Sequence, residues 1–103
     1  MKDVKFREAL DAYVDEMGFE EETLILDNHD YDKSIIGITE DGRLIYDFNK
    51  MVEEFAEDEE CDETEAIEWL EYNTLRALPY MGDRAPIIIQ ETRESILDKY
   101  GGQ

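Results

Sequence analysis

The sequence predicts an α+β domain in which a small antiparallel or mixed sheet packs against four helices. Apolar residues recur at helical spacing in four segments, each long enough for an amphipathic helix. Two β-branched runs flank an Asp-Gly pair, which is a strong hairpin signal. The 103 residues are 42% hydrophobic and 11% aromatic, so residues 1–103 are expected to form a single domain with its own core.

The first segment, residues 3–17, is predicted to be a helix that Asp3 caps and Gly18 ends. Its apolar face comprises Phe6, Leu10, Tyr13, Val14 and Met17. A short strand is expected near residues 23–27 (TLILD), after a polar connection. Residues 28–33 are expected to form an exposed turn with Asx-type hydrogen bonds.

The central part of the chain predicts a hairpin followed by a helix. The hairpin spans residues 34–47, with its turn at Glu40-Asp41-Gly42. Asp47 is expected to cap a second helix. The buried stripe of that helix has the spacing i, i+3, i+4, i+7 and i+8 and consists of Phe48, Met51, Val52, Phe55 and Ala56.

A third helix is predicted from Asp62 to about Leu78, because Asp62 with Glu65 resembles a capping box. Pro79 and the glycine at 82 are expected to end it. Its core face comprises Ala66, Ile67, Leu70, Thr74, Ala77 and Leu78. Asn73 is expected to lie on the core side, tied by a hydrogen bond to a neighbouring loop.

The C-terminal region predicts a strand and a last helix. Residues 86–90 (PIIIQ) form an edge strand in this interpretation, because Pro86 cannot donate to a ladder. A continuous helix beginning at Pro86 is the competing interpretation. Residues 91–100 are predicted to form a helix with Ile96, Leu97 and Tyr100 facing inward.

Charge is the most unusual property of the chain. The net charge is -19, and eleven carboxylates but no basic residue lie between residues 51 and 75. By contrast, residues 76–103 contain four acids and four bases. Direct nucleic-acid binding and docking to an anionic membrane are therefore not expected, since phosphate contacts need clustered Lys and Arg.

The acidic run coincides with helical apolar spacing, so a folded surface is expected to hold its carboxylates. At a rise of about 1.5 Å per residue the run carries one charge per roughly 3.4 Å, close to the phosphate spacing of a DNA strand. This pattern predicts a nucleic-acid mimic that occupies the groove of a basic nucleic-acid-binding protein. The alternative interpretation is a solvated helix face without a binding role. The predicted partner-binding residues are Glu53, Glu54, Glu57, Glu60, Glu63, Glu65, Glu68, Glu71, Trp69 and Tyr72.

An aromatic margin beside the acidic helix supports a second interpretation. Trp69, Tyr72 and Arg76 share one edge of the helical wheel, and Tyr80 and Arg84 follow it. These residue types are enriched at binding hot spots, although at this spacing they also occur at the rim of a core. The alternative function is thus a generic acidic interaction module or adaptor.

Catalytic, metal and cofactor sites are not predicted. Asn28, Asp30 and Asp32 resemble the start of a calcium loop, but Lys33 and Thr39 stand where that loop needs Gly and Glu. The single histidine, His29, could join Asp27 or Asp30 around a transition metal, but no second His and no Cys pair supports such a site. The chain is expected to be non-enzymatic, without a cofactor, and a monomer or weak homodimer.

Localisation is expected to be cytoplasmic. Cys61 is the only cysteine, so no disulfide framework exists, and its acidic surroundings disfavour the reactive thiolate. The N-terminal residues contain no apolar signal-peptide core, and no stretch approaches the length of a membrane span.

Two stretches, SIIGITEDGRLIYDFNKMVEEF and EAIEWLEYNTLRALPYMGDRAPIII, resemble a family of short acidic proteins encoded in Firmicutes genomes and their phages. The resemblance covers residues 31–89, roughly three-fifths of the chain. No activity is assigned to that family, so it implies no catalytic residues. It implies a mobile-element context, in which small acidic proteins often inhibit host defence as anti-CRISPR or anti-restriction proteins that mimic DNA.

Overall fold

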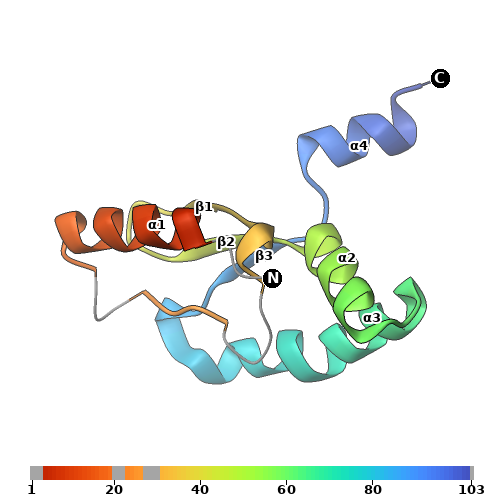
Figure 1. Ribbon diagram of the computed structural model, residues 1–103, viewed down its shortest axis with the longest axis horizontal. Coiled ribbons are helices and arrows are strands. Elements are labelled where there is room, and N and C mark those ends of the chain that lie inside the picture. The colour runs from red at the N-terminus through yellow and green to blue at the C-terminus, as the bar shows by residue number, and fades with distance from the viewer. Residues whose placement is uncertain (1–3, 20–22, 27–30, 103) are drawn as a thin grey trace.

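A three-stranded mixed sheet forms the centre of the computed structural model, which describes residues 4–19, 23–26 and 31–102. Its strands, in the order β1-β2-β3, are β1 (Ile35–Ile38), β2 (Leu44–Asp47) and β3 (Ile87–Ile89). β1 runs antiparallel to β2, whereas β3 runs parallel to it at the sheet edge, where Pro86 predicts it. The predicted α+β class is confirmed (Figure 1).

Four α-helices accompany the sheet in the described residues: α1 (Val4–Met17), α2 (Phe48–Glu59), α3 (Glu63–Trp69) and α4 (Arg93–Tyr100). Gly18 follows α1 with a φ of 80°, as expected of a glycine helix end. Leu10 and Val14 of α1 are buried, but Tyr13 and Met17 are exposed. The predicted apolar face of α1 is therefore only partly covered.

The predicted hairpin is confirmed. β1 and β2 pair with a bulge at Ile36, because Ile35 faces Tyr46 while Gly37 faces Ile45. Gly42 closes the turn with a φ of 86°, and a Cβ atom there would lie 2.7 Å from the Phe19 ring. Only glycine satisfies both conditions.

α2 supplies much of the core, as its periodicity predicts. The Asp47 side chain accepts a hydrogen bond from the Lys50 backbone N–H at 3.3 Å and so caps the helix. The left-handed residue Glu60, with a φ of 53°, ends it. The buried core residues of α2 and α3 are Phe48, Met51, Val52, Phe55 and Ala66.

The strand predicted near residues 23–27 is not found. Residues 23–26 are irregular, and Asp27 lies outside the described residues. The backbone N–H of Leu26 donates at 3.0 Å to the hydroxyl of Tyr46, a buried side chain of β2. Because a strand's side chains point away from the plane of its sheet, this bond places the segment over a sheet face rather than along an edge.

The third helix extends beyond its predicted end. A π-helical turn, η2 (Leu70–Thr74), follows α3, and a 3₁₀ segment, η3 (Leu75–Arg84), follows η2. Pro79 lies inside η3, because its fixed φ suits a 3₁₀ path, and the break comes at Gly82 with a φ of 80°. Asn73 is also exposed, and its side chain donates to the Trp69 carbonyl at 3.0 Å rather than to a loop.

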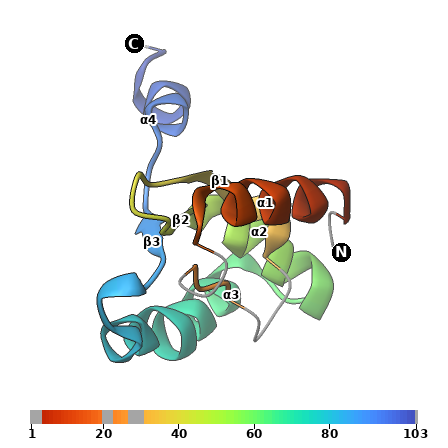
Figure 2. The same ribbon diagram turned by 90° about the vertical axis from the view of Figure 1, so that its left-hand side faces the viewer.

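The predicted orientation of α4 is wrong. Ile96, Leu97 and Tyr100 were expected to face inward, yet 48%, 56% and 68% of their respective surfaces are exposed. Figures 1 and 2 show why, because α4 projects from the rest of the chain in both views. Periodicity identifies an apolar face, but it cannot show whether another element covers that face.

Residues 28–33 were expected to form an exposed turn, but Tyr31 and Asp32, which the structure describes, are buried. Residues 27–30, and with them most of the calcium-like pattern, lie outside the described residues. Tyr31 is 1% exposed and Asp32 is 4% exposed. Arg7 of α1 donates to both carboxylate oxygens of Asp32, at 3.0 and 3.2 Å. Asp32 thus ties α1 to η1 (Asp32–Ser34).

We expect Tyr46→Phe to lower the free energy of unfolding by about 1–3 kcal/mol, because it leaves the buried Leu26 N–H without its acceptor. Urea denaturation measures the change. Tyr80→Phe, at a side chain 90% exposed, is the matched control and should change nothing. Equal stabilities of the two variants would contradict the role assigned to the Tyr46 hydroxyl.

Alkaline stability should depend on Tyr31. Burial raises the pKa of Tyr31 to about 12, with smaller contributions from Glu54 and Glu59, while a hydrogen bond with Thr74 lowers it. The folded pKa exceeds the unfolded value of 10.0, so the folded state keeps the Tyr31 hydroxyl neutral where the unfolded chain ionises it. The contribution of Tyr31 to the free energy of unfolding is therefore complete below pH 10 and is lost as the pH rises through 12. Tyr31→Phe should flatten the fall in unfolding free energy between about pH 10 and 12, and Tyr80→Phe should not.

Candidate functional site: the acidic surface of α2 and α3

Ten of the eleven carboxylates between residues 51 and 75 are exposed, and only Glu54 is half-buried. The helices that hold them are fixed by caps at their N-termini. The Asp62 side chain accepts from the Glu65 N–H at 2.9 Å, as Asp47 does for α2. Since the segment contains no Lys or Arg, its own residues cannot neutralise this surface.

Glu54 differs from the other predicted contact residues. Its carboxylate accepts a hydrogen bond from the buried Ser34 hydroxyl at 2.6 Å. This bond ties α2 to η1. Glu54 therefore contributes to the fold, and it is less available to a partner than the exposed Glu53 and Glu57.

The carboxylates do not all converge on one face. Glu53 of α2 and Glu63 of α3 line the same hollow of about 290 Å³, together with Lys99 of α4. Glu68 and Glu71 line a separate groove along α3 and η2. The carboxylates therefore divide between at least two surfaces, and the division falls within α3, between Glu63 and Glu68.

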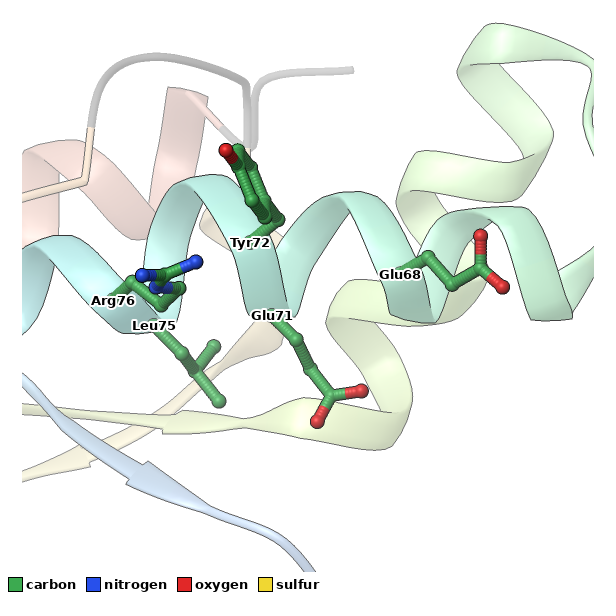
Figure 3. Close-up of a pocket in the computed structure, with 5 residues that line it drawn as sticks. All are labelled: Glu68, Glu71, Tyr72, Leu75 and Arg76. Atoms are coloured by element: carbon green, nitrogen blue, oxygen red, sulfur yellow. The ribbon is translucent and has the colours of Figure 1, made fainter.

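The groove along α3 and η2 is a shallow hollow of about 590 Å³. Figure 3 shows its five lining residues, Glu68, Glu71, Tyr72, Leu75 and Arg76. Glu71 and Leu75 point to one side of the helix, and Tyr72 points to the other. The Arg76 guanidinium lies 5.0 Å from the centre of the Tyr72 ring, in a cation–π contact. The acidic and aliphatic groups of Glu71 and Leu75 therefore share one side of this stretch, and the Tyr72–Arg76 pair borders it.

The aromatic margin divides into structural and surface residues. Trp69 stacks on Phe55, with ring centroids 4.7 Å apart, and is half-buried against the core. Arg84 lies 3.8 Å from Asp41 and over the Phe19 ring, so it supports the hairpin turn. Tyr72, Tyr80 and the flanking Arg76 remain on the surface. The sequence could not separate these roles, because it does not show which side of the margin other elements cover.

Other candidate chemistry finds little support in the described residues. Partial burial, followed by the nearby carboxylates of Glu65 and Asp62, raises the pKa of the Cys61 thiol and disfavours its thiolate. Within residues 4–19, 23–26 and 31–102, no three His, Cys, Asp or Glu side chains are grouped as a metal site would require. The helices of these ranges are all too short or too polar to cross a membrane.

Comparison with protein-family models, with curated proteins and with solved structures gives no significant match.

Trp69→Ala and Tyr72→Ala should separate the structural aromatic residue from the surface one. We expect Trp69→Ala to lower the free energy of unfolding by about 2–4 kcal/mol, because it removes the stacking on Phe55. Tyr72→Ala should change it by less than about 1 kcal/mol, because the ring is exposed. Thermal and urea unfolding measure both. A larger loss in Tyr72→Ala would contradict this division.

Proposed function

We propose that this protein is an acidic inhibitor that mimics nucleic acid and occupies the groove of a basic nucleic-acid-binding protein. One observation carries the proposal: a folded surface exposes ten carboxylates from a segment without a single basic residue. Such a surface attracts a basic groove over a long range and repels nucleic acid. Inhibition by occupation of a groove needs no catalytic group, and we accordingly propose a non-enzymatic protein.

The side that carries α3 and η2 is the contact surface in this proposal. There Glu65, Glu68, Glu71 and Tyr72 are all exposed. Carboxylates would pair with the Lys and Arg side chains that normally hold phosphates, and the exposed ring would add contact area. Glu53 and Glu63 lie on another surface, so they would contribute to long-range attraction more than to the contact itself.

A nuclease or CRISPR effector of a bacterial defence system is the proposed partner, with the cytoplasm as the proposed place of action. The resemblance to short acidic proteins of Firmicutes and their phages supports this context. The partner must have a basic groove, because only an opposite charge can offset the desolvation of so many carboxylates.

The second candidate is an acidic adaptor that binds through its aromatic residues. The exposure of Tyr72 and Tyr80, at 69% and 90%, favours it, because exposed Tyr rings are available to a partner and Tyr is enriched at binding hot spots. In this case the carboxylates would act only as a solvated surface.

The decisive experiment starts with capture of partners from a Firmicutes host lysate at low and high salt. The mimic should retain a basic nucleic-acid-binding protein at low salt, and duplex DNA should displace it. If duplex DNA fails to displace the captured protein, the mimic proposal is refuted.

Charge variants then test the contact surface against the captured protein. Glu65→Gln, Glu68→Gln and Glu71→Gln together should weaken binding about tenfold, since three exposed pairs contribute about 0.5 kcal/mol each. The matched control removes three charges from α1 by Glu8→Gln, Asp11→Asn and Asp15→Asn, and should weaken binding far less. The adaptor alternative predicts the reverse, with loss on combining Tyr72→Ala and Tyr80→Ala and no loss in the charge variants.

A further inference from the structure

The orientation of α4 is the reverse of that of an ordinary surface helix. Its polar residues Ser95, Asp98 and Lys99 line the hollow that faces α2 and α3. Ile96, Leu97 and Tyr100 are about half or more exposed on the other side. A surface helix normally turns its apolar face to the core. The apolar residues of α4 are therefore exposed together on one side of the helix, as at an interaction surface.

A hydrogen-bonded joint holds α4 in this orientation. Asn49 of α2 donates to the Gln90 carbonyl and to the Glu91 carboxylate, each at 3.3 Å. Glu91 also accepts from Ser95 and from Lys99, both at 2.8 Å. Thr92 and Ser95 form a reciprocal capping box. Turning α4 over to cover its own apolar face would break either the bonds from Asn49 or those that Glu91 accepts, whereas the capping box would move with the helix.

An apolar groove lies between α1 and β1 on the same side of the molecule. Its volume is about 260 Å³, and its eight lining residues carry no charge. They are Phe6, Ala9, Leu10, Tyr13, Ile35, Ile36, Gly37 and Ile38. Four consecutive strand residues line it, although their side chains alternate between the sheet faces. The groove therefore runs along the outer edge of β1.

The helix and the groove adjoin each other. Ile36 lines both the α1–β1 groove and the hollow at the base of α4. Figures 1 and 2 show α4 rising from the side of the molecule that carries α1 and β1, whereas η2 and η3 follow the opposite side. The apolar face of α4 and the apolar α1–β1 groove thus lie on one side of each chain.

We propose that two copies of this chain form a symmetric dimer in which α4 of each copy docks its apolar face in the α1–β1 groove of the other. A two-fold exchange makes both contacts at once and closes, so it leaves neither surface open for further growth. Leu97 and Ile96 are the central contacts from α4, and Ile36 and Tyr13 are their counterparts in the groove.

The charge distribution favours a second copy as the occupant. The groove lining is uncharged, and α4 contains two acids and two bases, so neither surface adds to the repulsion between two chains of charge -19. A strongly basic partner would instead be attracted to the acidic run. Repulsion between the remaining charges opposes dimerisation, so added salt should strengthen it. Salt should weaken the inhibitor contact proposed above, which makes the two associations distinguishable.

Cross-linking tests which surfaces meet. In a Cys61→Ser background, a chain with Leu97→Cys is mixed with a chain with Ile36→Cys and oxidised by copper phenanthroline. We expect a disulfide-linked dimer of the two chains, whereas Leu97→Cys mixed with Val4→Cys should give little, since Val4 is exposed on α1 outside the groove. A stronger disulfide between the Leu97→Cys residues of two copies would show that α4 pairs with α4, and would refute the α1–β1 groove as the site that receives α4. Exclusive linkage within one chain that carries both cysteines would show fold-back and overturn the exchange.

Sedimentation tests whether the dimer exists. The unmodified protein should show a dimer fraction that rises between about 0.05 and 0.5 M salt as repulsion is screened. Combining Ile96→Ser with Leu97→Ser should abolish it without loss of fold, because neither residue is buried in the monomer, and Val4→Ser should leave it unchanged. A wild-type chain that remains monomeric at all salt concentrations would refute the proposal.

Discussion

The central strand β2 connects every layer of this structure. It pairs with β1 on one side and with β3 on the other, and Leu44 and Tyr46 within it are completely buried. Its last residue, Asp47, caps α2 and so determines where the main core helix begins. The Tyr46 hydroxyl holds the irregular segment that passes over the sheet. A disturbance of β2 would therefore reach the sheet, the core helix and the overlying segment together.

Electrostatic repulsion constrains what is built on this core. A chain of 103 residues with a net charge of -19 must offset its self-repulsion by burial of a modest number of apolar side chains. The structure places its densest charge on the solvent sides of α2 and α3, where water screens it. The half-buried Glu54 is held by a hydrogen bond from Ser34, and the buried Asp32 by Arg7. Charge and core thus coexist because the burial of carboxylates is limited and compensated.

The two proposed associations use different physics on different sides of the molecule. The acidic surface beside Tyr72 suits a basic partner and acts through attraction that salt weakens. The face of α4 and the α1–β1 groove are uncharged or neutral and act through apolar burial. A dimer that forms through the α4 face and the α1–β1 groove would leave the helical stretch from α3 to η3 exposed. Each dimer would then present two copies of the acidic surface.

Local signals predicted the elements they specify directly. The Asp-Gly hairpin, the Asp47 cap, the stripe of α2 and the edge position of β3 follow from turn chemistry, capping and side-chain periodicity, and all are confirmed. The exposure of the acidic run also followed from its residue types. Less local features were missed: the segment at 23–26 is no strand, and η2 and η3 carry the helix past Pro79.

Sequence patterns alone predicted the four helices, the hairpin, the edge strand and the location of the charge, although they wrongly predicted a strand at residues 23–26. Which faces are covered depends on how the elements pack against one another. Trp69 and Tyr72 are both aromatic and share one margin of the predicted helix, yet Trp69 stacks on Phe55 and Tyr72 is exposed. The acids of one run likewise divide between two surfaces, and α4 turns its apolar face outward. These outcomes differ because periodicity shows which side of a helix is apolar, whereas burial depends on contacts between residues distant in the sequence.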